Sequence, residues 1–142
     1  PQHITTQAQL NEWEQHNIVA GQRWGFRAAR RRKVLEEAFI RELHKRMFDQ
    51  TWVWAGTFRT TDKTIGRPWE QIGMRLNQLL ANVEWQIANQ AGAPDAIAVQ
   101  FHRELVWIHP FPNGNGRHAR LATDILIEQL GNKRFSWGAN AD

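Results

Sequence analysis

The chain has 142 residues, of which 42% are hydrophobic and 11% aromatic, and its formal net charge is +4. This length fits one domain, residues 1–142, and the apolar content is typical of a packed globule rather than a disordered chain. The absence of cysteine excludes disulfide bonds and thiolate metal sites. No apolar run approaches the ~20 residues of a membrane span and no signal-peptide core is present, so we expect a cytoplasmic protein without a membrane segment.

Arginine dominates the positive charge, since 14 of the 18 basic residues are arginine. The guanidinium group binds phosphate in a bidentate manner and stays charged at every working pH. The excess of positive charge therefore suits a nucleotide, a nucleic acid or an acidic protein partner, and does not by itself choose among them.

The N-terminal third predicts two helices. Thr5 and Thr6 can cap a helix over residues 7–18, whose apolar side chains fall near one face. Apolar residues spaced three and four apart then predict a longer helix over residues 28–48. The basic run at 30–33 lies near the start of this second pattern and is interpreted as a solvated face.

The composition changes after this pattern. Residues 51–54, TWVW, are aromatic and β-branched, so they suit a strand or an extended connector. Residues 56–67 are rich in threonine and contain Asp62-Lys63 as a turn. This segment predicts a small β-hairpin that projects from a helical body.

The C-terminal half predicts three further helices. Prolines begin helices over residues 68–89 and 94–108. Pro110 lacks a backbone N–H and disfavours helical geometry at His109, so the second of these helices ends there. A third apolar pattern predicts a helix over residues 119–130.

Gly131 and Asn132 provide a stop for this last helix, and we expect Phe135 and Trp137 beyond it to pack back on the body. The predicted fold class is therefore mainly α, a single helical domain with one small hairpin.

Residues 108–120, IHPFPNGNGRHAR, combine groups that suit a phosphate-handling site. A histidine with a pKa near 6.5 is largely neutral at pH 7, as a general base must be. The glycines let the backbone approach an oxyanion closely, and the first amides of the following helix add partial positive charge. Arg117 and Arg120 are three positions apart and can neutralise a leaving pyrophosphate from the same helical side. The segment therefore predicts a site that holds a nucleoside polyphosphate and activates a nucleophile.

Each of these residues also has a purely structural interpretation when it is taken alone. A histidine before proline commonly ends a helix, Pro-Asn-Gly is a common turn, and Phe111 suits a core position. Their combination in one segment favours the functional interpretation.

The segment resembles the signature of the Fic family, HPFx(D/E)GNGRxxR. Eight residues match it: His109, Pro110, Phe111, Gly114, Asn115, Gly116, Arg117 and Arg120. The preceding stretch FHRELVWIHPF is similar to the family's lead-in helix, and WAGTFRTTDKTIGRPWEQI is similar to its flap hairpin and following helix. More narrowly, the chain resembles the subgroup called mobile mystery protein B, which is associated with mobile elements and a helix-turn-helix partner.

Most Fic proteins transfer AMP from ATP to a hydroxyl of a target protein and release pyrophosphate. The resemblance implies a Fic-like helical domain that acts as a protein adenylyltransferase on Tyr, Ser or Thr, with its motif loop at 109–120. It implies His109 as the catalytic general base and Phe111 as the buried anchor of the loop. The nucleotide would be bound by the backbone of Gly114–Gly116, by a side-chain or backbone contact from Asn115, and by Arg117 and Arg120 at the terminal phosphates.

Target docking is assigned by the same resemblance to a flap at about residues 57–66. Its docking residues would be Thr60, Thr61 and Ile65. We expect an extended target segment to pair with the flap main chain, because strand addition positions a hydroxyl without demanding much of the target's sequence.

Asn113 is the one departure from the signature, since the family has an acidic residue there that coordinates Mg²⁺. Magnesium prefers carboxylate oxygen, and the amide of Asn113 offers only a neutral oxygen. We therefore expect ATP as the donor, with Mg²⁺ bound more weakly than in the family.

The inhibitory pattern (S/T)xxxE(G/N), whose glutamate pairs in the family with the residue matching Arg120, is missing. None of the nine glutamates has Ser or Thr four positions before it. A separate inhibitory or antitoxin-like partner, or an inhibitory segment outside this chain, is the corresponding expectation.

Two other functions remain open at this point. The same site could transfer phosphate or another nucleotide-derived group. Alternatively, Asn113, the high pI of about 10.3 and the basic run at 30–33 suit a nucleotide-sensing or nucleic-acid-binding module without turnover.

Overall fold

The computed structural model describes residues 6–131, and this part of the chain is helical. Its elements in chain order are α1 (Gln7–Ala28), α2 (Glu37–Phe48), the 3₁₀ helix η1 (Trp69–Gln71), α3 (Ile72–Ala88), α4 (Pro94–Ile108) and α5 (Asn115–Gln129). The mainly α fold class is confirmed. The packing expected of Phe135 and Trp137 concerns residues outside the described range.

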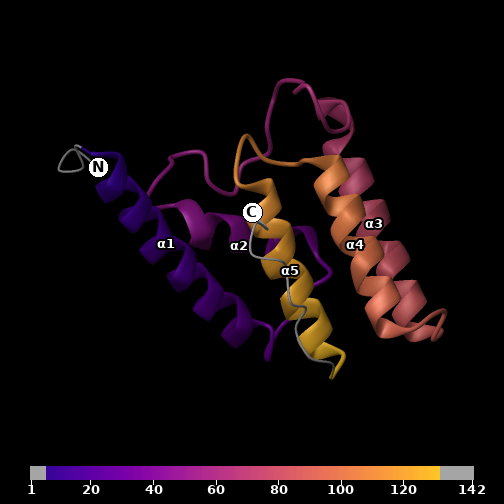
Figure 1. The fold of residues 1–142 in the computed structure, drawn as a ribbon. Helices are drawn as coiled ribbons and strands as arrows, with labels where there is room; N and C mark the ends of the chain where they lie inside the picture. Colours follow the sequence, from indigo (N-terminus) through magenta and orange to yellow (C-terminus); the bar gives the residue numbers. More distant parts are fainter. Residues whose placement is uncertain (1–5, 132–142) are drawn as a thin grey trace.

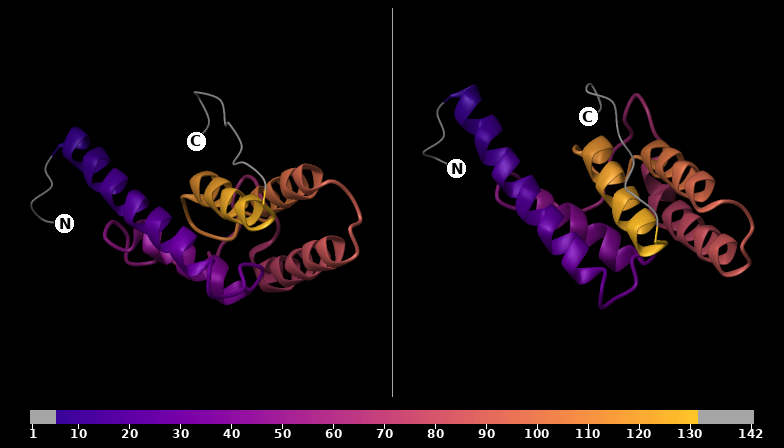
Figure 2. Two further views of the ribbon diagram at one scale, coloured as in Figure 1. Left: turned by 90° about the horizontal axis from the view of Figure 1, so that it is seen from below. Right: turned by 60° about the horizontal axis from the view of Figure 1, so that its bottom comes forward.

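Helix α5 occupies the middle of the molecule (Figure 1). Helices α1 and α2 contact each other on one side of it, and the antiparallel pair α3 and α4 lies on the other side, an arrangement that the views of Figure 2 also show. Nine of the fifteen residues of α5 are buried. The motif segment therefore leads directly into the best-covered helix of the fold, which gives the candidate site a rigid support.

The core is built from the apolar faces of these helices. Its largest fully buried side chains are Phe39, Phe48, Phe101, Phe111, Ile40, Leu43, Met47, Ile72, Leu76, Leu105, Ile125 and Leu126. Burial of this apolar surface is the main term that stabilises the fold.

The predicted boundaries of the first two helices are wrong. Helix α1 continues to Ala28, because Gly21 and Gly25 act as packing points rather than as breaks. A Cβ at Gly21 would lie 2.7 Å from the backbone of Met47, so only glycine lets α1 approach α2 this closely. The basic run at 30–33 consequently lies in the connection before α2, not inside a helix.

The predicted β-hairpin is also wrong, since no strand occurs in residues 6–131. The side chain of Arg59 accounts for the difference, because it lies between the two arms of the segment. Its guanidinium donates to the carbonyls of Thr61 and Arg67, so the two arms are joined through this side chain rather than by main-chain pairing. Residues 51–54 likewise form turns, in which the N–H groups of Thr51 and Trp52 bond to the carbonyl of Phe48.

The last helix begins earlier than predicted, at Asn115 rather than residue 119. Gly114 and Asn115 start the helix inside the motif itself, so Gly116 and Arg117 belong to its first turn. In the described part of the chain, none of the helices is both long and apolar enough to cross a membrane.

Candidate active site

His109 ends helix α4 in a left-handed conformation, with φ 55° and ψ 62°. Its N–H still donates to the carbonyl of Leu105 at 3.2 Å, but Pro110 prevents a further helical turn. Left-handed geometry costs a non-glycine residue about 1 kcal/mol or more, so the fold must hold this turn in place. The predicted end of the helix at this residue is confirmed.

The motif loop turns back at Gly114, whose φ is 77°. A Cβ at this position would lie 2.7 Å from the buried ring of Phe48, so both the conformation and the space require glycine. A pocket of about 480 Å³ opens above the loop. It is lined by His109, Pro112, Asn113, Gly114, Asn115, Gly116 and Arg117.

The pocket faces the N-terminus of α5, which has no side-chain cap. The first N–H groups of a helix have no intrahelical acceptor, and the helix dipole adds partial positive charge at the same end. An anion bound in the pocket would therefore meet the backbone amides of the motif glycines and the guanidinium of Arg117.

The side chain of Asn115 bonds to the backbone of the loop. It does not make the side-chain phosphate contact that the resemblance allows. Its Oδ1 accepts the N–H of Phe111 at 3.0 Å, and its Nδ2 donates to the carbonyl of Phe111 at 2.8 Å. The side chain is buried and fully engaged in closing the loop. Only the backbone N–H of Asn115 is left to contact a nucleotide.

Phe111 is completely buried, as expected of a residue that anchors the loop to the core. Its ring stacks on the imidazole of His44, with 3.8 Å between the ring centroids, and meets His118 edge-on at 5.0 Å. The loop between His109 and the motif glycines is thereby fastened to the core at its midpoint.

His44 was missed by the sequence analysis, although it holds the motif loop. Its Nδ1 accepts the N–H of Gly56 at 2.9 Å, so its Nε2 carries the proton and donates to the carbonyl of Asn113 at 2.9 Å. Burial, the neighbouring His118 and the Arg117 cation lower the pKa of His44 to about 3. The signal that could have identified it is a histidine on the buried face of α2, four residues after Ile40 and four before Phe48.

His118 is a second buried histidine beneath the loop. Its Nε2 donates to the carbonyl of Ile40 at 2.9 Å, and burial lowers its pKa to about 4. Two neutral histidines thus tie the motif segment to α2.

The two motif arginines lie differently. Arg117 lines the pocket, lies over the ring of Phe48, and has its Nη1 3.6 Å from the Oε2 of Glu14 in α1. Arg120 is absent from that pocket and lines a hollow of about 240 Å³ between α1 and α5, together with Arg117. The structure therefore brings Arg117, but not Arg120, to the same pocket as His109.

The imidazole of His109 is half-buried and lies among cations. Burial, then Arg59 and then Lys63, lower the pKa of His109 below its usual value of 6.5. Its Nδ1 is buried and has no hydrogen-bond partner among the described residues. The ring is therefore neutral at pH 7, and Nε2 is the nitrogen that we expect to face a substrate.

Within the described part of the chain, side chains do not form a magnesium site at the motif loop. Asn113 is exposed, and its Oδ1 accepts the N–H of Gly114 at 2.7 Å. No residue that lines the pocket is a carboxylate. Across residues 6–131, no group of three acidic, histidine or cysteine side chains is placed to hold a metal ion.

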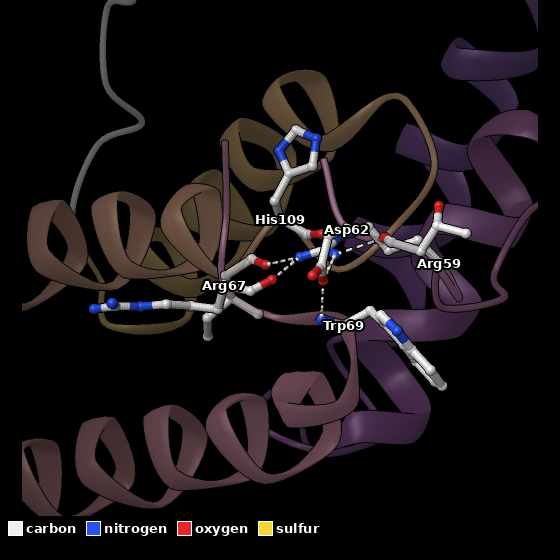
Figure 3. A network of polar contacts seen from close by, with 7 residues as sticks. Arg59, Asp62, Arg67, Trp69 and His109 are labelled. Carbon is white, nitrogen blue, oxygen red and sulfur yellow. Dashed lines mark hydrogen bonds and ion pairs between the residues drawn. The ribbon is translucent and has the colours of Figure 1, made fainter. Parts of the chain in front are cut away.

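The flap residues Thr60, Thr61 and Ile65 are exposed, and 58% of Ile65 is accessible. Gly66 returns the segment to the site, where a Cβ would lie 2.7 Å from the Cβ of His109. The flap thus passes directly beside the candidate base, as an irregular loop rather than a hairpin. Figure 3 shows Arg59 at the base of this loop, a residue to which the sequence analysis gave no role.

Comparison with known proteins identifies the class to which this fold and site belong. The sequence profile of the Fic/DOC family matches residues 34–127, which include α2, the flap and the motif loop. The chain belongs to the Fic/DOC family.

Individual relatives agree with this assignment. The chain is 35% identical over 97 residues to the protein adenylyltransferase fic-1 of Caenorhabditis briggsae, a match that covers 65% of this chain and 19% of that protein. It is 47% identical over 47 residues to a uridine 5'-monophosphate transferase of Xanthomonas campestris pv. campestris (strain 8004), covering 30% of this chain and 9% of that protein. The chain thus spans about a fifth or less of the length of these relatives.

A solved structure shares the fold. A Fic domain containing signaling protein from Bacteroides thetaiotaomicron superposes with a TM-score of 0.78 at 22% sequence identity. The match covers 88% of this chain and 51% of that protein. At this level of identity the similarity concerns the fold alone.

Proposed function

We propose that the chain is a protein adenylyltransferase that transfers AMP from ATP to a Tyr, Ser or Thr hydroxyl of a target protein. The observation that supports this most is the pocket in which His109 lies opposite the N-terminus of α5 and Arg117. A base, an amide cradle and a cation around one cavity are the groups that nucleotidyl transfer requires.

In the proposed reaction His109 takes the proton of the target hydroxyl. The hydroxyl oxygen then bonds to the α-phosphorus of ATP, and the bond between that phosphorus and the oxygen bridging to the β-phosphate breaks. Pyrophosphate leaves with the negative charge that the helix amides and Arg117 can stabilise. The lowered pKa of His109 keeps it unprotonated at neutral pH, as this role demands.

Magnesium would accompany ATP as a complex with the phosphates, since the pocket supplies no carboxylate. The proposal therefore assigns no step to a metal held by this chain. The subgroup resemblance adds the hypothesis of a helix-turn-helix partner. The missing inhibitory pattern adds that of a separate inhibitory protein, and the sequence features noted first add that of a cytoplasmic location.

A second candidate is transfer of a different nucleotide group. The relative named uridine 5'-monophosphate transferase, which matches this chain over a short segment, favours it. The phosphate cradle is built from backbone amides and makes no distinction between bases, so the same chemistry could use UTP.

Nucleic-acid binding by the basic run at 30–33 has less support. Arg32 pairs with Glu42 at 3.1 Å and Lys33 with Glu84 at 3.5 Å, so two of its four cations are partly neutralised.

The direct test incubates the protein with cell lysate and with ATP labelled either at the α- or at the γ-phosphate. Adenylyl transfer predicts protein-bound α-label, no γ-label, and loss of the signal in His109→Ala. UTP labelled at the α-phosphate tests the second candidate in parallel. If His109→Ala transfers the label as well as wild type does, His109 is not the general base.

A further inference from the structure

Arg59 is a buried cation at the junction between the flap and the motif loop. Only 2% of the residue is exposed. A buried charge is costly unless hydrogen bonds compensate for the lost water, so its partners must be accounted for.

Backbone carbonyls supply most of this compensation (Figure 3). Nε donates to the carbonyl of His109 at 2.6 Å, and Nη2 donates to the carbonyls of Ile108 at 3.1 Å and Arg67. Nη1 donates to the carbonyl of Thr61 at 2.9 Å. Four of the five N–H groups of the guanidinium therefore have a carbonyl acceptor.

Two of these carbonyls end helix α4. The last carbonyls of a helix lack intrahelical donors and carry partial negative charge, so a cation there is favourable. Arg59 thus caps the helix at the point where His109 adopts its left-handed conformation. The backbone N–H of Arg59 also donates to the carbonyl of Pro110 at 2.9 Å, which fixes the residue that follows His109 in the loop.

The other two carbonyls belong to the two arms of the flap. Thr61 lies at the start of the exposed segment 60–65 and Arg67 lies after its end. Asp62 adds a countercharge, with its Oδ1 3.9 Å from Nη1, and also accepts the N–H of Trp69 at 2.9 Å. One side chain therefore joins both flap arms to the backbone of the candidate base.

We propose that Arg59 is a positioning residue that sets the distance and register between the flap and His109. A target main chain docked on residues 60–66 then presents its hydroxyl at the imidazole. This inference rests on the proposed function, because it assigns to the flap the docking of a target.

The same geometry gives Arg59 an electrostatic effect on the base. Figure 3 shows the imidazole directed away from the guanidinium, so the two groups are neighbours without a hydrogen bond between them. Of the charges near His109, the Arg59 guanidinium lowers the pKa of His109 most, and Lys63 from the flap also lowers it. Arg117 from α5 lines the same pocket.

Two substitutions separate tethering from charge. Arg59→Lys keeps a cation but loses the planar fork that reaches four carbonyls. Arg59→Met removes the charge as well. Arg67→Met is the matched control, because the side chain of Arg67 stacks on Trp107 and only its carbonyl takes part in the network.

Kinetics of transfer to a target protein give the first readout. Arg59→Lys should lower kcat/KM for the target about tenfold or more while the ATP KM stays within about twofold, because misplacing a docked substrate by ~1 Å slows its reaction by at least this order. The control Arg67→Met should change kcat/KM for the target much less. Equal kcat/KM values for wild type and Arg59→Lys would overturn the proposal.

Two measurements without nucleotide keep the inference separate from the proposed activity. Hydrogen exchange of amides 60–66 should become faster in Arg59→Lys, and NMR titration of His109 should show its pKa rising toward 6.5 in Arg59→Met only. If the wild-type protein transfers nothing but the faster exchange and the pKa rise are both observed, the positioning role of Arg59 is supported and the adenylyltransferase proposal fails. If Arg59→Met does not fold, Arg59→Lys alone tests the positioning role. Unchanged hydrogen exchange of amides 60–66 in Arg59→Lys would refute that role.

Discussion

At the scale of single residues, the site depends on a neutral imidazole beside a loop that admits only glycine. His109 is partly buried and lies near Arg59 and Lys63, and burial together with these two cations lowers its pKa and favours the form that accepts a proton. Gly114 turns the loop at a positive φ against the ring of Phe48. Gly114 and the neighbouring Asn113 each lead to a prediction.

Gly114→Ala should destabilise the protein by about 2–5 kcal/mol, since left-handed geometry costs about 1–2 kcal/mol and overpacking against Phe48 adds about 1–3 kcal/mol. Gly131→Ala is the matched control, because Gly131 has φ 81° but no atom of residues 6–131 lies within 4 Å of the added Cβ. Urea unfolding measures both variants. Equal losses in the two would show that the contact with Phe48 does not constrain the loop.

Asn113→Asp places a carboxylate at the mouth of the pocket. We expect the Mg²⁺ concentration for half-maximal transfer to fall on the order of tenfold, because an added unit charge ~4 Å from a divalent ion is worth about 2 kcal/mol even in water. Asn82→Asp, exposed on α3, controls for the change in net charge. An unchanged Mg²⁺ dependence of Asn113→Asp would remove this position from metal binding.

At the scale of elements, α1 reaches the motif arginines across the groove that it forms with α5. The carboxylate of Glu14 lies 3.6 Å from Arg117, the arginine that also lines the pocket of His109. A nucleotide phosphate that binds Arg117 must therefore compete with this ion pair. This ion pair could not be predicted from the inhibitory pattern (S/T)xxxE(G/N), because Glu14 does not lie in such a pattern. Its partner is also Arg117 rather than Arg120.

Glu14→Gln should consequently strengthen ATP binding by about two- to fivefold, the factor that corresponds to a partly exposed ion pair of ~0.5–1 kcal/mol. Isothermal calorimetry with ATP measures this change. Glu12→Gln removes the same charge from an exposed position of the same helix and should leave the affinity unchanged. Equal effects of the two substitutions would attribute the gain to net charge alone.

At the scale of the whole molecule, buried neutral histidines link the stability of the fold to pH. His44 and His118 have pKa values lowered to about 3 and 4, whereas in the unfolded chain both titrate near 6.5. Below pH 6.5 the unfolded state therefore binds more protons than the folded state, so stability falls as the pH falls.

Between pH 7.5 and 5, each of these two histidines should reduce the free energy of unfolding by about 2 kcal/mol, while most carboxylates stay ionised. Urea unfolding across this range measures the loss. His118→Gln keeps an N–H donor for the carbonyl of Ile40 but cannot titrate, so it should remove about 2 kcal/mol of this loss. A stability that is flat over this range would contradict neutral burial of both rings.

The parts of the fold that were predicted correctly are those with a local cause. Pro110 and the apolar stripe of α4 place the end of that helix at His109, and the motif glycines place the turn of the loop at Gly114. The parts that were not predicted depend on residues distant in the sequence. Gly21 is a contact point for α2 rather than a helix break, and Arg59 caps a helix about 50 residues away, which leaves no local pattern.

The central claim is that the pocket between His109 and α5 transfers AMP to protein hydroxyls. Mass spectrometry of lysate peptides after incubation with the protein, ATP and Mg²⁺ tests it most directly, with His109→Ala in parallel. The proposal predicts adenosine monophosphate on Tyr, Ser or Thr side chains with wild type and none with His109→Ala. Uridine monophosphate or phosphate adducts, or AMP adducts that persist in His109→Ala, would contradict it.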